Sequence, residues 1–303
     1  MDCEGMILEK STVILISSPE FAKHFEEKYN KKYRKMGRFS LDESKYRNSD
    51  SNLVILTNPD EDYIERVVIN ATRHKKARDF PNGFHVIFLI IDPNFAESIQ
   101  ILDKAIRYIN TRRTLIIAPI ILSEKQKILG VLNKIKEVQE SIKPLLPYHM
   151  PESRDSVIDL FLLPVTSFWR GHTGVLDATV NIEWTDFYYM ASDSINLFLT
   201  DEFASSDVIK LRDKVVGKLK SIDKINISGI CISIFGTKEL SLRDVNDVVH
   251  GIFDAFEEKI SLTWSVTVDA DAQISRVYVI TVSYTHLRAH ETRHDLVCRL
   301  LLE

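Results

Sequence analysis

The first half of the chain alternates short hydrophobic runs with segments whose apolar residues recur every three or four positions. A continuous run such as FHVIFLII at 84–91 is typical of a central parallel strand, because such a strand is buried on both faces. The amphipathic segments are typical of helices that cover a sheet. We therefore expect a doubly wound α/β domain over residues 1–150. The predicted strands are 11–17, 52–58, 84–91 and 114–122, and the predicted helices are 18–33, 96–110 and a long helix after Ser123.

Two serines mark the starts of helices in this domain. Ser18 is a suitable N-cap because its hydroxyl can accept from a free backbone N–H, and Pro19 has the fixed φ that suits the first helical position. Ser123 is the expected N-cap of the long helix. The polar stretch at 37–51 is expected to be a loop.

The pattern changes near residue 151. Residues 151–174 are apolar nearly all round, which predicts a central connecting helix buried between two bodies, with a kink at Pro164. Residues 175–281 then predict a smaller α+β domain. Its expected elements are a strand at 178–184, helices at about 186–200 and 205–222, a strand at 226–235, a helix after Ser241, and strands at 261–269 and 275–281 that pair with each other.

The helix after Ser241 has a recognisable start. Asp244 follows Ser241 by three positions, which is the spacing of a capping box. The residues beyond are amphipathic. The side chains expected to point inward are Leu242, Val245, Val249, Ile252 and Phe256.

The last segment, residues 282–303, shows none of these patterns. It reads VSYTHLRAHETRHDLVCRLLLE and resembles a translated sequencing adapter, so we expect the native protein to stop near Thr281. His286, His290 and His294 have the spacing of a helical metal cluster, but in an adapter-derived tail they carry no function. The remaining histidines have no ligand spacing, and we predict no metal site.

Composition and charge exclude several classes of protein. The chain has 303 residues, and its 39 Lys and Arg nearly balance its 43 Asp and Glu, so it has no basic surface for nucleic acid. The apolar runs are too short to span a bilayer, and the first residues are unlike a signal peptide. Three scattered cysteines indicate a reducing compartment. We expect a cytoplasmic protein with no nucleic-acid partner and no direct membrane insertion.

Three stretches of the second half follow one another in a distinctive order and spacing. They are GVLDATVNIEWTDFYYM at 174–190, FGTKELSLRDVNDVV at 235–249 and SVTVDADAQISRVYVI at 265–280. This order resembles the tubulin/FtsZ family over about 150–280, whereas residues 10–150 agree with it in topology. The resemblance implies a GTPase-like α/β domain, a central helix and a smaller α+β domain.

The resemblance also implies a role for Asn181, Glu183 and Asp186. In the family, subunits stack head to tail, and this loop meets the GTP of the neighbouring subunit, where carboxylates orient the attacking water. The three residues are therefore the candidate catalytic residues, acting on the neighbour. Glu183 is one methylene longer than the family's aspartate, which favours slow hydrolysis. The alternative is that all three are solvated polar residues at the end of a strand.

The chain's own GTP-facing loops depart from the family pattern. The junctions ILISSPEFAKH and LIIDPNFAESIQ contain no glycine, although glycine permits close approach of backbone N–H groups to phosphate. Pro19 and Pro93 each remove an N–H donor. Glu20, Asp92 and Glu97 add negative charge where a triphosphate would lie. These departures predict weak or lost binding of GTP, and of Mg²⁺ with it.

Some residues could still hold GTP. Asp155 stands where the family's carboxylate recognises guanine, and it is equally explained as an acidic residue in the first turn of a helix. The other candidates are the hydroxyls of Ser17 and Ser18 and the backbone N–H groups from Asn94 to Ser98.

The sequence therefore predicts a cytoskeletal or cell-division protein that assembles head to tail, with itself or with an FtsZ-family homologue, and has little GTPase activity. The alternative is an active, divergent GTPase that polymerises with GTP. An unrelated α/β enzyme has no support, because the chain has no nucleophile elbow and no dinucleotide-binding fingerprint.

Overall fold

The computed structural model describes residues 11–36, 52–72, 85–109, 114–138, 142–147, 158, 178–180, 196–203, 208–221, 227–255, 260–268 and 275–283. The chain divides into two compact units, Met1–Val165 and Thr166–Glu303, and each is described separately. In the predicted central helix, the structure describes Ile158, which is helical and fully buried. The predicted limits of that helix, 151 and 174, lie outside the described residues.

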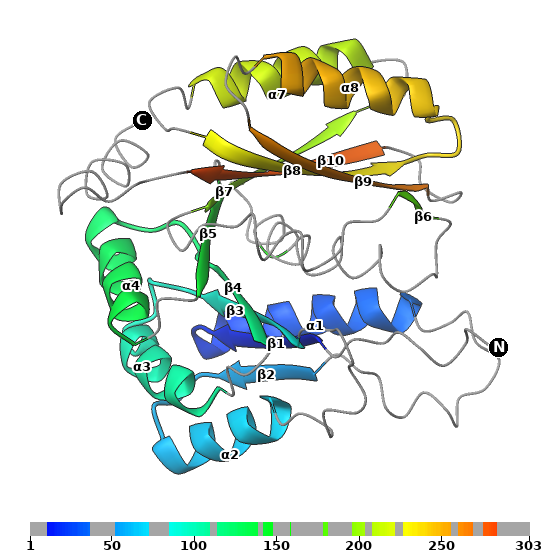
Figure 1. Ribbon diagram of the computed structural model, residues 1–303. Helices are drawn as coiled ribbons and strands as arrows, with labels where there is room; N and C mark the ends of the chain where they lie inside the picture. Colours follow the sequence, from blue (N-terminus) through cyan, green and yellow to red (C-terminus); the bar gives the residue numbers. More distant parts are fainter. Residues whose placement is uncertain are drawn as a thin grey trace. The chain divides into compact units, whose positions relative to one another are not determined.

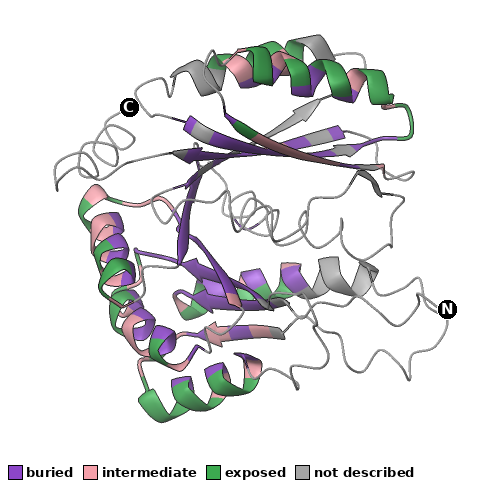
Figure 2. Cartoon of the chain, in the orientation of Figure 1, coloured by how far each residue is buried: buried purple, intermediate pink, exposed green. Residues whose placement is uncertain are grey.

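The first unit contains a parallel sheet with the strand order β2-β1-β3-β4-β5 (Figure 1). The strands are β1 (Ser11–Ile16), β2 (Asn52–Leu56), β3 (His85–Ile91), β4 (Thr114–Pro119) and β5 (Lys143–Pro147). In the centre of the sheet, Ile14 pairs with Val54 of β2 and with Leu89 of β3. Every described side chain of β3 is buried, as Figure 2 shows, which agrees with the continuous hydrophobicity of this run.

Helices follow four of these strands. They are α1 (Pro19–Met36), α2 (Glu61–Thr72), α3 (Ser98–Tyr108) and α4 (Lys125–Val138). The connection from β1 to β2 crosses the sheet in one direction, and the later connections cross it in the other. Because such connections are right-handed, α1 lies on one face of the sheet and α2, α3 and α4 lie on the other. This doubly wound arrangement confirms the predicted α/β fold.

Two local features of the first unit differ from expectation. The sequence did not predict α2, which buries only Ile64, Val68 and Thr72 on its inner side. The helix α4 begins at Lys125, so Ser123 lies one residue before the N-cap position. Its hydroxyl donates to Asn94 Oδ1 at 2.5 Å instead.

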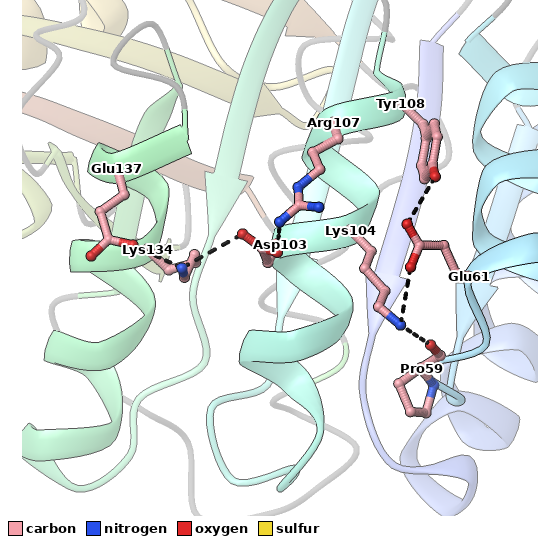
Figure 3. Close-up of polar contacts among 8 residues, drawn as sticks. All are labelled: Pro59, Glu61, Asp103, Lys104, Arg107, Tyr108, Lys134 and Glu137. Atoms are coloured by element: carbon pink, nitrogen blue, oxygen red, sulfur yellow. Dashed lines mark hydrogen bonds and ion pairs between the residues drawn. The ribbon is translucent and has the colours of Figure 1, made fainter.

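Polar side chains connect the layer formed by α2, α3 and α4 (Figure 3). The ammonium of Lys104 donates to the Pro59 carbonyl at 2.7 Å and lies 3.6 Å from the Glu61 carboxylate, which also accepts from the Tyr108 hydroxyl. On the other side of α3, Lys134 lies 3.5 Å from Asp103. Each such surface pair contributes at most about 1 kcal/mol, so these contacts set the spacing of the helices more than they stabilise them.

The second unit contains a mixed sheet with the strand order β7-β10-β8-β9-β6. The strands are β6 (Ala178–Val180), β7 (Asn196–Phe203), β8 (Ile227–Gly236), β9 (Ser261–Val268) and β10 (Ser275–Ser283). Strands β8 and β9 are parallel, and β10 is antiparallel to both β7 and β8. The helices α7 (Val208–Ser221) and α8 (Leu242–Asp254) pack against each other and cover one face of the sheet (Figure 1).

Three predictions for this unit are wrong. Residues 196–200 were expected to be helical but belong to β7, where pairing with β10 determines the conformation. The strands β9 and β10 do not pair with each other, because β8 lies between them and α8 provides a crossover from β8 to β9. Leu242 was expected to point inward but is 60% exposed, since it lies in the first turn of α8 at the edge of the buried stripe.

The predicted start of α8 is confirmed. The Ser241 hydroxyl accepts from the Asp244 N–H at 3.2 Å, and the Asp244 carboxylate accepts from the Ser241 N–H at 3.0 Å. The two residues therefore form a capping box. Hydrogen bonds from Ser241 hold the pKa of Asp244 below its ordinary value of 3.8.

Ser241→Ala is expected to destabilise the protein by about 1 kcal/mol at pH 7, because the Asp244 N–H loses its acceptor and the Asp244 carboxylate loses the Ser241 hydroxyl. A carboxyl with a lowered pKa stabilises the fold above its unfolded pKa and loses that contribution as the pH falls through its folded pKa. The loss of stability caused by Ser241→Ala should therefore become smaller below about pH 4. Thermal unfolding at pH 7 and pH 3 measures both effects. Ser261→Ala, at the exposed start of β9, is the control and should change Tm little; an equal loss there would contradict the capping role.

The last described strand, β10, extends two residues beyond Thr281, the predicted end of the native chain. Val282 is buried and pairs with Asn196 of β7 and Gly229 of β8, and Ser283 pairs with Ile227. The rest of the predicted adapter-derived tail lies outside the described residues. Among the described helices, none is both long and apolar enough to cross a membrane.

Candidate functional site

The strand order of the first unit reverses between β1 and β3. From β1 the chain passes to β2 on one side and then returns to β3 on the other, so the helices that follow β1 and β3 diverge. In open α/β sheets, ligands bind outside the carboxyl ends of strands at this kind of reversal. The residues here are Ser17 and Ser18 after β1 and 92–98, which run from the end of β3 to the first residue of α3; we call them the β1/β3 edge. The Asp92 N–H donates to the Ile16 carbonyl at 2.9 Å and joins the two sides.

The loop between β1 and α1 uses its polar groups locally. Ser17 is fully buried, its N–H donates to the Leu56 carbonyl at 3.4 Å, and its hydroxyl donates to the Ser18 carbonyl at 3.3 Å. The Ser18 hydroxyl accepts from the Phe21 N–H at 3.3 Å, and the helix begins at Pro19. Ser18 is therefore an N-cap, as predicted.

The loop between β3 and α3 is also closed by its own hydrogen bonds. The N–H of Asn94 donates to Asp92 Oδ1 at 2.9 Å, and the N–H of Phe95 donates to the Asp92 carbonyl at 3.2 Å. The N–H of Ser98 donates to the Phe95 carbonyl at 3.0 Å. Three backbone donors that could hold a phosphate are thus engaged within the loop.

Asp92 is a buried carboxyl at the centre of this loop, and only 8% of its surface is exposed. Burial raises its pKa above the ordinary value of 3.8, because the charged form loses hydration. Hydrogen bonds from the backbone and side chain of Asn94, and the positive charge of Lys127, oppose this rise in pKa. Groups of its own chain therefore offset part of the cost of burying this charge.

The loop after β4 contributes to the same edge. The Ile121 N–H donates to the Ile91 carbonyl at 2.9 Å, which extends the pairing of β4 with β3. This contact brings Ser123 to Asn94, so a polar chain runs from the Ser123 hydroxyl through the Asn94 amide to Asp92. Neither Ser123 nor Lys127 was expected at this edge from the sequence. The signal for Ser123 was its position shortly after the buried strand β4, whereas Lys127, in the first turn of α4, had no such signal.

The structure brings four of the predicted site residues to one edge: Ser17, Ser18, Asn94 and Ser98. Ser17 and Ser98 are buried, whereas Ser18 is half-buried and Asn94 is exposed. The other predicted site residues, Asp155, Asn181, Glu183 and Asp186, lie outside the described residues. Within the described part of the chain, no group of His, Cys, Asp and Glu has the arrangement of a metal site.

The fold of the chain is that of the FtsZ/tubulin-like proteins. It is similar to an FtsZ dimer structure from M. jannaschii, described as empty, with a TM-score of 0.62 and 12% sequence identity over 92% of this chain and 89% of that one. It is also similar to CetZ from Methanosaeta thermophila, with a TM-score of 0.55 and 10% identity over 95% and 90% of the two chains. At these identities the likeness concerns the fold. No family model and no curated protein sequence matches the chain.

Proposed function

We propose that this chain is a cytoplasmic, FtsZ/tubulin-like filament subunit that assembles head to tail and binds GTP weakly or not at all. The fold supports the first part of the proposal, because the chain covers nearly the whole length of the FtsZ and CetZ structures that it resembles. The segment with Asn181, Glu183 and Asp186 supports it further, since it follows directly after β6. In the proposal, these three residues meet the nucleotide-facing edge of the next subunit.

The hydrogen bonds of the β1/β3 edge support weak GTP binding, and they are the observation that carries this part of the proposal. The amides of Asn94, Phe95 and Ser98 already have acceptors within the loop. Neither connecting loop contains a glycine, and Pro93 has no N–H to offer. A phosphate would have to displace these contacts, which does not fit the open amide cradle that a triphosphate needs.

Assembly and GTP binding can be tested on the same full-length protein. Sedimentation and electron microscopy, with GTP, GDP or no nucleotide, are expected to show filaments whose amount does not depend on nucleotide. Titration calorimetry with GTP and Mg²⁺ is expected to give a Kd weaker than roughly 100 μM. Where the chain alone does not assemble, mixing it with an FtsZ-family homologue tests for a copolymer.

Two outcomes would contradict the proposal in different ways. Failure to sediment alone and with a homologue would contradict filament assembly. A micromolar Kd for GTP that is lost in Asp155→Ala would contradict weak binding and would support the active GTPase instead.

A further inference from the structure

We propose that the carboxylate of Asp92 is the group that excludes nucleotide phosphate from the β1/β3 edge. It does so by taking, within its own chain, donors that a phosphate would need. This inference rests on the proposed function, which makes this edge the one that faces nucleotide. It goes further by assigning the loss of binding to one side chain.

The first argument concerns the donors. A carboxylate oxygen and a phosphate oxygen accept the same kind of charge-assisted hydrogen bond, so they compete for one N–H. The N–H of Asn94 donates to Asp92 Oδ1 at 2.9 Å, and the side-chain amide of Asn94 also bonds to this carboxylate. The Ser123 hydroxyl holds that amide in place from the opposite side, through Asn94 Oδ1. The backbone and side-chain donors of Asn94 therefore converge on an anion that belongs to the protein.

The second argument concerns the position of the carboxylate. The N–H of Asp92 donates to the Ile16 carbonyl, and its carbonyl accepts from Phe95. The backbone N–H is thus tied to the end of β1, the carbonyl closes the turn that follows, and Pro93 fixes the next φ. With 8% of its surface exposed, Asp92 is held at this point and is not a solvated surface residue.

The third argument concerns charge. A buried carboxylate repels a phosphate more strongly than an exposed one does, because water screens it less. The neighbouring cation is Lys127, which acts on the Asp92 carboxyl and also pairs with Glu124 at 3.4 Å. An incoming phosphate would have to compete with both carboxylates for this ammonium.

Asp92→Asn tests the proposal because it removes the charge and leaves a neutral amide oxygen, which holds the Asn94 N–H less strongly than a carboxylate does. We expect the full-length variant to bind GTP with Mg²⁺ at least tenfold more tightly than the wild type, measured by titration calorimetry. Inorganic phosphate is the second probe, and the variant should also bind it more tightly than the wild type does. The matched control is Glu97→Gln, which removes one negative charge from the same loop at a residue whose side chain makes no cap hydrogen bond; its affinity should change less than threefold.

Unchanged affinity in a folded Asp92→Asn protein would overturn the proposal, as would an equal gain in Glu97→Gln. Asp92→Ser, which also keeps an acceptor, is the second variant. Since burial disfavours the charged form of Asp92, neutral replacements should fold, and unfolding of both variants would likewise contradict the proposal. Sedimentation separates the two hypotheses. If the protein forms filaments but Asp92→Asn binds GTP no more tightly, the proposed function stands and the role of Asp92 is wrong. If Asp92→Asn binds GTP more tightly but the protein forms no filaments, the role of Asp92 stands and filament assembly is wrong.

Discussion

Phe88→Ala will lower the free energy of unfolding by about 3–5 kcal/mol, because it leaves a cavity at the central strand of the first unit. Phe88 is fully buried, and its strand β3 lies between β1 and β4. Natural domains are stable by only about 5–15 kcal/mol, so this single change removes a large share of the total. Urea unfolding followed by circular dichroism measures the loss.

The control for this prediction is Phe253→Ala, which makes the same substitution on α8. Phe253 is 41% exposed, so its removal leaves no closed cavity, and the expected loss is below about 1 kcal/mol. If Phe88→Ala lowers the free energy of unfolding no more than Phe253→Ala does, Phe88 is not in a closely packed core.

Replacing Asn181, Glu183 and Asp186 together by alanine will abolish filament assembly and leave the monomer folded. The reason is the proposed head-to-tail contact, in which these polar groups meet the next subunit; polar side chains of these types are seldom core residues. Polar contacts at a subunit interface are lost with each truncated side chain, and a repeating contact multiplies the effect along a filament. Sedimentation measures assembly, and thermal unfolding measures the fold of the monomer.

The matched control for this triple variant is the replacement of Asp62, Glu65 and Asn70 by alanine. These residues have the same three chemical types and are exposed on α2 of the first unit. Their removal should leave sedimentation unchanged. Normal filaments from the first triple variant would contradict the head-to-tail contact at residues 181–186.

The fold of the first unit could be predicted because its signals are local and strong. The run of β3 is apolar throughout, and a strand buried on both faces requires that composition. Ser18 caps α1 through a contact within three residues, which sequence spacing reveals directly, as it does for Ser241 in the second unit. The helix α2 escaped prediction because its exposed Tyr63 and Ile69 blur the narrow buried stripe.

The second unit was harder to predict because its strands depend on distant partners. Phe198, in β7, pairs with Ile280 of β10, and no local pattern encodes a contact over that separation. Strands that are neighbours in sequence often form hairpins, yet β9 pairs in parallel with β8 and leaves β10 to the other side.

The candidate site shows the same limit. The sequence placed Asp92 in a loop without glycine, and its charge was recognised as unfavourable for a phosphate. Its burial, its bond to the Asn94 N–H and the approach of Ser123 depend on how two loops meet at the end of the sheet. Side-chain convergence of this kind follows from tertiary structure and has no sequence pattern of its own.

The place of β10 has a consequence for how the protein is made. This strand is the last described element of the chain, yet it is inserted between β7 and β8 in the sheet. During synthesis the first unit can fold early, whereas the second cannot close until residues 275–283 have left the ribosome. Until then the facing sides of β7 and β8 have unpaired backbone groups, and the nascent polypeptide passes through a stage in which it is most open to misassembly and to capture by chaperones.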